Sequence, residues 1–201
     1  MPSVIEICNR ALSNIGNSRS INSLNEASKE AGECSLHFDA CRDAVLSDFD
    51  WNFATRRVAL ADTNSPPPDW QYAYRYPTDC LRITAIMLPG VRNPASADRI
   101  QYEVGADSSG TGKLIYTDQP QAWLKYVMRI TDVNMFDAIF QEALAWRLAA
   151  AINMALTGSA DLGNNALNMY YRVILSAGSH SMNESQEPVQ PESEFTIARL
   201  S

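Results

Sequence analysis

Residues 27–54 read ASKEAGECSLHFDACRDAVLSDFDWNFA, and this stretch decides the fold class of the first part of the chain. Its apolar side chains recur every three or four residues, at Ala27, Ala31, Cys34, Phe38, Cys41, Val45 and Phe49. That spacing places them on one face of an α-helix. The pattern therefore predicts a long amphipathic helix that begins after Ser23-Leu24-Asn25-Glu26, a possible capping box, and continues to Phe49.

Upstream of this helix, the sequence predicts a second, shorter one. Ser3-Val4-Ile5-Glu6 has the spacing of a capping box, in which the Ser and Glu side chains bind backbone N–H groups of the first turn. Gly16 follows as a candidate C-terminal stop. Apolar residues at helical spacing fill the interval, at Val4, Ile7, Cys8, Ala11, Leu12 and Ile15.

Downstream, from Trp51 to about Thr131, the pattern changes to that of short strands. Pro66–Pro68 and an aromatic run at Trp70, Tyr72, Tyr74 and Tyr76 precede β-branched and apolar stretches such as residues 82–87. Residues 101–104 and 113–117 flank a glycine-rich loop, and residues 122–130 alternate as a further strand. We expect a small antiparallel sheet.

Helical spacing returns at residue 132. The segment to Thr157-Gly158 carries few charges after Ala143, so it is expected to be buried on most sides. Another amphipathic helix follows from Leu162, with Gly178 as its expected end. The sequence thus predicts a single α+β domain over residues 1–201. Its expected parts are a helical core (3–50 and 132–178), an inserted β-rich region (51–131) and an extended, polar C-terminal arm (179–201).

Composition excludes several classes of protein. The chain has 201 residues, of which 46% are hydrophobic and 19% charged, so it can bury a core and is not a disordered chain. Its net charge of −7 has the wrong sign for general nucleic-acid binding. The N-terminal residues show no basic signal region, and no 18 apolar residues run together, so no membrane partner is expected. Four scattered cysteines predict reduced thiols rather than a disulfide framework.

The candidate chemical motifs are weak. Cys34, His37 and Cys41 could share one helix face as zinc ligands, but a fourth ligand is missing and core packing is favoured. Residues 105–113 contain glycines and a lysine, but their spacing is not that of a phosphate-binding loop, and a hairpin tip is favoured. Two histidines and no Gly-x-Ser-x-Gly motif argue against a Ser or Cys triad. We predict no metal, no cofactor and no catalytic residue.

Alternatives stay open for the helical carboxylates, for a basic pair and for the aromatic cluster. Helical carboxylates such as Glu6, Glu26 and Glu33 could serve glycoside cleavage, although exposed helix faces explain them more simply. Arg56-Arg57 is a compact basic spot for which pairing with carboxylates is the simpler explanation. The aromatic cluster of the β-rich region, with only Arg75 among its members, favours packing or a protein interface over base stacking.

The order of several short motifs resembles the head-to-tail adaptors of short-tailed bacteriophages, the tail tubular protein A and tail accessory factor group. The resemblance covers most of the chain. The motifs are Arg42-Asp43 before Trp51-Asn52-Phe53-Ala54, the stretch Tyr72 to Ile83 with Pro77, Asp79, Cys80 and Arg82, then Ile115 to Asp118, Lys125 to Asp132, Phe136-Asp137, Leu148 to Ala151, Leu156-Thr157, and Phe195 to Arg199. The region after the last helix lacks the acidic stretch, and the tail lacks the Trp, found in some members.

This resemblance implies a structural virion protein made in the host bacterial cytoplasm. It would form a homododecameric ring at the head-tail junction that binds the portal protein and the tail tube or nozzle protein. Duplex DNA would pass through without specific binding, which an acidic chain suits because it does not hold phosphates. The expected interface residues are Trp70, Tyr72, Tyr74 and Tyr76 in the β-rich region, and Phe195, Ile197, Ala198 and Arg199 in the arm. Trp51, Phe53, Pro77, Asp79 and Arg82 are expected to hold the fold. The alternative is a peptidoglycan-cleaving, tail-associated enzyme; a DNA-binding packaging factor is disfavoured by the charge.

Overall fold

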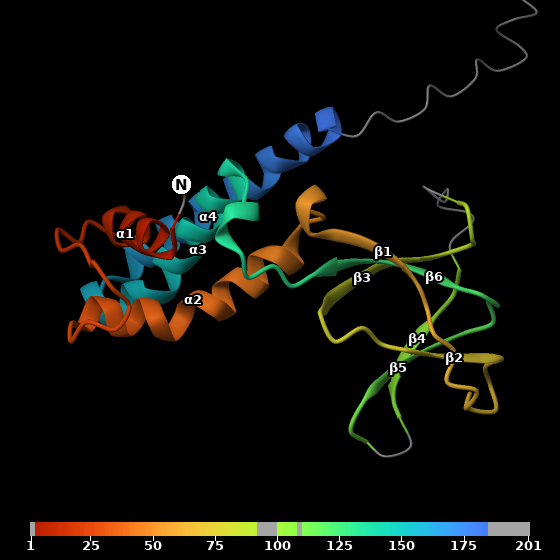
Figure 1. Cartoon of the computed structure of the whole chain (residues 1–201). Coiled ribbons are helices and arrows are strands. Elements are labelled where there is room, and N and C mark those ends of the chain that lie inside the picture. The colour runs from red at the N-terminus through yellow and green to blue at the C-terminus, as the bar shows by residue number, and fades with distance from the viewer. Residues whose placement is uncertain (1–2, 92–99, 108–109, 185–201) are drawn as a thin grey trace, which may run out of the picture.

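The computed structural model of the chain describes residues 3–91, 100–107 and 110–184. Within these ranges, four α-helices gather at one end of the molecule and six strands at the other (Figure 1). The α+β prediction is confirmed. The helices are α1 (Val4–Asn14), α2 (Lys29–Asp48), α3 (Ala138–Thr157) and α4 (Ala160–Glu184), with short 3-10 turns at Asn52–Ala54 and Val133–Met135.

The expected caps are present at two helices and shifted at a third. Ser3 Oγ accepts the N–H of Glu6 at α1, and Gly16 ends that helix with a φ of +73°. At α2, Ser28 and not Ser23 is the N-cap, its Oγ accepting the N–H of Ala31. Gly158, with a φ of +68°, closes α3 as expected.

The last helix is longer than the sequence predicts. Gly178 was the expected end of α4, but the helix continues to Glu184. Gly178 is not among the positive-φ residues, so it does not form the left-handed cap that would stop the helix. The first six residues of the expected arm are therefore helical, and residues 185–201 lie outside the described ranges.

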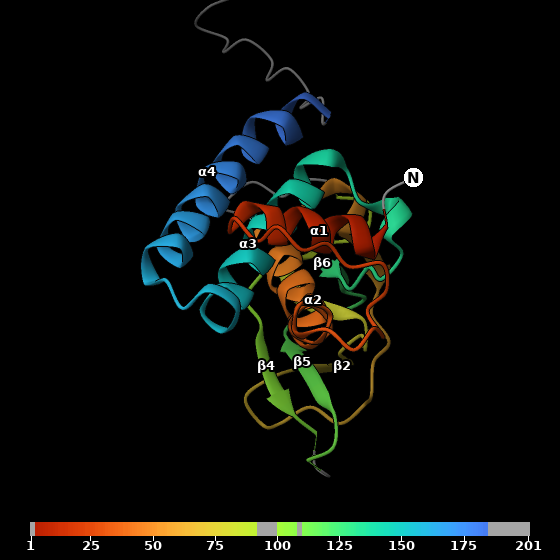
Figure 2. The same cartoon turned by 90° about the vertical axis from the view of Figure 1, so that its left-hand side faces the viewer.

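The helix α3 is the centre of the helical half. It contacts α1, α2 and α4, and Figure 2 shows it between them. Its buried face includes Phe140, Leu144, Leu148 and Ile152, which join α1, α2 and α4 in the larger hydrophobic core. The prediction that this low-charge helix is enclosed on most sides is confirmed.

The β-rich region forms two antiparallel sheets rather than one. The strands β1 (Thr55–Ala59), β6 (Trp123–Met128) and β3 (Cys80–Met87) make the first sheet in that order. The strands β2 (Tyr72–Arg75), β5 (Lys113–Thr117) and β4 (Glu103–Ala106) make the second. A smaller core lies between the sheets and draws on both, with Tyr74, Ile86, Ile115, Leu124 and Tyr126 among its residues.

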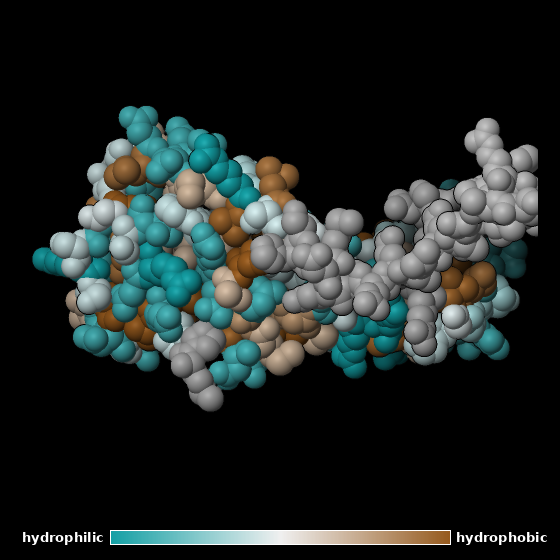
Figure 3. Space-filling model, turned by 90° about the horizontal axis from the view of Figure 1, so that it is seen from above, coloured by the Kyte–Doolittle hydropathy of each residue, from teal (hydrophilic) through white to brown (hydrophobic). Residues whose placement is uncertain are grey.

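The strand β6 links the two halves. Because side chains alternate along a strand, Leu124 and Tyr126 enter the smaller core while Val127 enters the larger one. The strand's continuation therefore joins the sheets to the helices. Seen from above, the two halves form two lobes, and hydrophobic side chains on this face are scattered among hydrophilic ones (Figure 3).

Candidate functional site

The structure places the four expected aromatic interface residues in different environments. Tyr74 is only 2% exposed, and its hydroxyl donates to the Gln119 carbonyl at 2.8 Å, so it is a core residue of the monomer. Tyr72 stacks on it, with ring centroids 6.1 Å apart, and is half-buried. Trp70 and Tyr76 are also half-buried. Burial thus removes Tyr74 from the side chains that a folded chain can present to a partner.

The other four expected interface residues, Phe195, Ile197, Ala198 and Arg199, lie outside the described residues. Their role stays a prediction.

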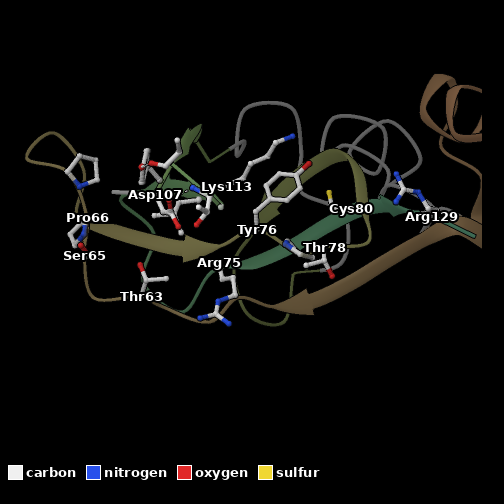
Figure 4. Close-up of a pocket in the computed structure, with 17 residues that line it drawn as sticks. Thr63, Ser65, Pro66, Arg75, Tyr76, Thr78, Cys80, Asp107, Lys113 and Arg129 are labelled. Atoms are coloured by element: carbon white, nitrogen blue, oxygen red, sulfur yellow. Dashed lines mark hydrogen bonds between the residues drawn. The ribbon is translucent and has the colours of Figure 1, made fainter. Parts of the chain in front are cut away.

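An open cleft of ≈ 970 Å³ lies beside β2 and β5. Figure 4 shows Lys113 directed toward the ring of Tyr76, 5.4 Å from its centroid, while Arg75 points to the other side of the cleft. Asp107 shapes the hairpin turn between β4 and β5 by accepting the N–H of Thr111 at 3.0 Å. Because β4 and β5 pair as antiparallel neighbours, the prediction that residues 105–113 form a hairpin tip is confirmed.

The three candidate zinc ligands all lie on α2 and make other contacts. Cys34 and Cys41 are buried in the larger core, and burial raises the pKa of the Cys41 thiol. His37 faces Glu33, with Nε2 3.6 Å from the carboxylate. All four cysteines are free, and nowhere in the described ranges do three or more His, Cys, Asp or Glu side chains group as metal ligands.

The carboxylates of the enzyme alternative are engaged in local contacts. Glu6 pairs with Arg10 at 3.3 Å on α1. Glu26 accepts the N–H of Asn22 and the hydroxyl of Ser28, and these bonds lower its pKa, whereas a general acid needs a raised one. Glu33 faces His37. The three lie on α1, in the loop before α2 and on α2.

Several of the stretches quoted for the family resemblance meet at the junction of the two halves. Asp43 on α2 accepts from Arg42 Nη2 at 2.9 Å and from Arg129 Nε, just after β6, at 2.8 Å. Asp50 pairs with Arg82 on β3 and accepts from Thr84 at 3.3 Å. We call this set of ion pairs the junction network. It ties α2 to the ends of β3 and β6.

Beside the junction network, Asp79 connects the strands of the first sheet. Its Oδ1 accepts the hydroxyl of Tyr126 at 3.0 Å, its Oδ2 faces Arg56 at 3.3 Å, and its carbonyl accepts the N–H of Arg129. The simpler explanation for Arg56, pairing with a carboxylate, is confirmed. Burial and the negative charge of Asp79 raise the pKa of Tyr126 to about 12.

An aromatic cluster fills the helical side of the same junction. Trp51 is 3% exposed, and its indole N–H donates to the Val45 carbonyl at 2.8 Å. Its ring meets Phe140 edge to face at 5.1 Å, and Phe53 packs between Phe136 and Phe140. The prediction that Trp51 and Phe53 hold the fold is confirmed, as is that for Asp79 and Arg82.

The helices also carry exposed apolar side chains that the sequence patterns did not mark as surface residues. Leu36, Met154 and Tyr171 are 70%, 65% and 59% exposed. Leu36 lies off the apolar stripe of α2, and this mismatch with the helical period was the available signal.

Comparison with known proteins does not assign the chain to a family: no family model matches it, and no curated protein does. Among the described residues, no helix combines the length and the apolar character that crossing a membrane requires.

Proposed function

We propose that this chain is a structural bacteriophage protein, a head-to-tail adaptor that binds beneath the portal, joins the capsid to the tail and lines part of the DNA channel as a ring of twelve copies. The carrying observation is that several of the resemblance motifs converge. Arg42-Asp43, Trp51 to Ala54, Asp79 to Arg82, Arg129 and Phe136 are far apart in the sequence and meet at one junction. Motifs that build a shared junction are those that a common architecture would retain.

The division of the chain into two halves supports an adaptor. A ring subunit needs surfaces for its lateral neighbours and for partners above and below. Here, a helical core from residues 3–50 and 132–184 and a β insertion from 51–131 supply separate surfaces, and the C-terminal residues supply the proposed arm. The net charge of −7 suits a channel along which DNA slides without being held.

The local engagement of the candidate carboxylates also favours a structural role over the peptidoglycan-cleaving enzyme. A glycosidase of the common type needs two carboxyl groups flanking one bond, one with a raised pKa. Glu26 has a lowered pKa, and Glu6 and Glu33 face basic side chains.

The testing experiment is native mass spectrometry of the full chain with and without the portal ring from the same genome. We expect a shift to a ring-sized complex when the portal is present. A version ending at Asn183 keeps every described helix and strand except Glu184, the last residue of α4, and is expected to lose this complex. Failure to associate at any salt concentration would overturn the proposal.

A cell-wall turbidity assay addresses the alternative. If the wild-type chain clears permeabilised cells and Glu6→Gln, Glu26→Gln or Glu33→Gln abolishes clearing, the enzyme replaces the adaptor as the proposed function. No clearing by the wild-type chain is the result that we expect.

A further inference from the structure

A shallow groove of ≈ 340 Å³ runs over α3, between α2 and α4. Figure 2 shows α2 and α4 on two sides of α3. Its lining is mostly small and apolar, with Ala40, Ala44, Ala150, Ala151 and Leu167 from the three helices. Small side chains allow a partner to approach the helix backbones closely.

Large exposed apolar side chains extend the groove lining on each helix. Leu36 is one turn before Ala40, Met154 is one turn after Ala150, and Tyr171 is one turn after Leu167. Residues four apart lie on the same helix face. Because these three side chains are all more than half exposed, they extend the alanine-lined floor with apolar surface that water covers in the isolated chain.

The groove also holds a cation without an anionic partner. Arg147, on α3, lies with its guanidinium carbon 5.8 Å from the ring centroid of Tyr170. Its Nε is buried and has no hydrogen-bond partner, and no carboxylate pairs with it in the described part of the chain. A buried, unpaired donor of this kind favours a ligand that brings a carboxylate.

An acidic residue lies on the α2 wall, beyond the groove. The helices α2 and α3 run antiparallel, since the thiol of Cys41 faces the carbonyl of Arg147 and Lys29 Nζ binds the carbonyl of Ala155. Glu33 is eight residues before Cys41, so it lies about 12 Å from the level of Arg147 along the helix axis. The surface therefore has the Arg147 guanidinium toward one end and the Glu33 carboxylate, with His37 beside it, toward the other. Small apolar side chains lie between them.

We propose that this groove binds residues 194–200 of a second copy of the chain. This segment reads EFTIARL. Glu194 supplies the carboxylate for Arg147, and Arg199 supplies the cation for Glu33. Phe195, Ile197 and Leu200 supply the apolar side chains for the alanine-lined floor and its rim. The order of charges in the segment thus complements the order in the groove.

The course of α4 favours a second copy over the same chain as the source of the segment. The helix continues from Tyr171, at the groove rim, to Glu184, which is about 20 Å farther along its axis. Figure 1 shows this end of α4 projecting beyond the other helices. The ten residues from 185 to 194 span at most about 35 Å, so a return to the same groove requires a reversal that uses most of this length. A neighbouring copy is reached without the reversal.

This contact rests on the proposed role of the arm in assembly. It is tested without the portal, so a negative result here would not bear on whether the chain binds the portal. The full chain is prepared with p-benzoylphenylalanine at position 195, as a ¹⁴N and a ¹⁵N sample, and the mixture is cross-linked by light. We expect cross-links from residue 195 to α2 or α3 peptides containing residues 36–44 or 147–154. The peptide pairs should include those that combine the two isotopes, which only different copies can form.

Two matched pairs of variants sharpen the test. Arg147→Gln should reduce the mixed-isotope cross-link at least five-fold, whereas Arg172→Gln, which removes an exposed guanidinium on α4, should leave it unchanged. Leu36→Ala should reduce it, whereas Leu88→Ala, an exposed leucine of the β half, should not. Glu194→Gln weakens the same contact from the segment side and does not alter the groove, so it gives an answer even if Arg147→Gln misfolds.

Three results would overturn the proposal. Cross-links only within one isotope would place the segment in its own chain. Cross-links to the β half, or none, would leave the groove without this occupant. An equal loss in the Arg147→Gln and Arg172→Gln variants would show that general charge, and not the groove, governs the contact.

Discussion

The helical half and the β half of this chain are stabilised differently. The helices share one large core in which α3 is enclosed by three partners, whereas the two sheets enclose a small core with six buried residues. The halves meet through β6, the aromatic cluster around Trp51 and the junction network. The difference indicates that the helical half holds the chain together, while the β half depends on its connection to the helices.

The largest expected effects come from matched leucine deletions in the two cores. Leu148 and Leu124 are both fully buried, the first on α3 and the second on β6. We expect Leu148→Ala to lower the free energy of unfolding by about 4 kcal/mol and Leu124→Ala by about 2–3 kcal/mol, because a small core between two thin sheets collapses more easily around a cavity. Chemical denaturation followed by circular dichroism measures both values.

Hydrogen exchange adds the spatial part of this test. Leu148→Ala should raise exchange in both halves, and Leu124→Ala mainly in the strands. An equal increase in both halves for both variants would show that the chain unfolds as one unit and that the contrast between the halves has no energetic meaning.

The next largest effect is expected at the junction network. Asp43→Asn removes the carboxylate that binds both Arg42 and Arg129, and the side chain of Arg42 is only 8% exposed. We expect a loss of about 2 kcal/mol, because a buried guanidinium loses a charged partner. Thermal or chemical denaturation measures it.

Asp39→Asn is the matched control, since Asp39 binds the same guanidinium but is 80% exposed. Its loss should be below about 1 kcal/mol. If the two variants lose the same stability, Asp43 does not act as a link between the halves.

A smaller effect is expected at the start of α3. The carboxylate of Asp137 accepts the N–H of Phe140 at 2.7 Å, which caps the central helix. Asp137→Ala should lower the stability of α3 by about 1 kcal/mol. Ser3→Ala is the equivalent change at the edge helix α1 and should lower the stability of that helix by about the same amount. Because α1 is peripheral, hydrogen exchange should show the Ser3 effect in α1 alone and the Asp137 effect throughout the helical half. The reverse pattern would contradict the central role of α3.

Much of the secondary structure was predictable because its signals are local. Helical spacing located all four helices, and Ser3, Gly16 and Gly158 marked ends that the structure has. Ser23 was a false start for α2 because Glu26 binds the N–H of Asn22 and the hydroxyl of Ser28, which makes residues 22–28 a turn. Gly178 was wrongly predicted to end α4, because the sequence does not show whether a glycine adopts the left-handed conformation that caps a helix.

The junction and the groove were not predictable, because each depends on residues that are distant in the sequence. Arg129 and Asp43 are 86 residues apart, and Tyr170 binds Asp48 across 122 residues. Strand pairing was unpredictable for the same reason. An alternating pattern is equally compatible with one sheet and with two, and only the packing of the core distinguishes the two arrangements. Asp43, Asp79 and Arg129 stand in separate stretches of the sequence, and nothing in those stretches shows that the three residues contact one another.

The smallest expected effect is a change in alkaline stability through Tyr126, which belongs to the smaller core. Burial and Asp79 raise its pKa from the ordinary value of 10 to about 12. Between these pH values, the unfolded chain loses the phenolic proton and the folded chain keeps it, so stability falls as pH rises. Tyr126→Phe removes this contribution, and its free energy of unfolding should decline less steeply from pH 10 to pH 12 than that of the wild type.

Tyr170, in the helical half, also has a raised pKa, from burial and from Asp48, so Tyr170→Phe should flatten the profile as well. Hydrogen exchange measured across this pH range shows whether the halves respond separately. They do so if Tyr126→Phe changes the pH dependence of exchange in the strands and Tyr170→Phe changes it in the helices. Identical responses of strands and helices in both variants would mean that the junction couples the halves fully.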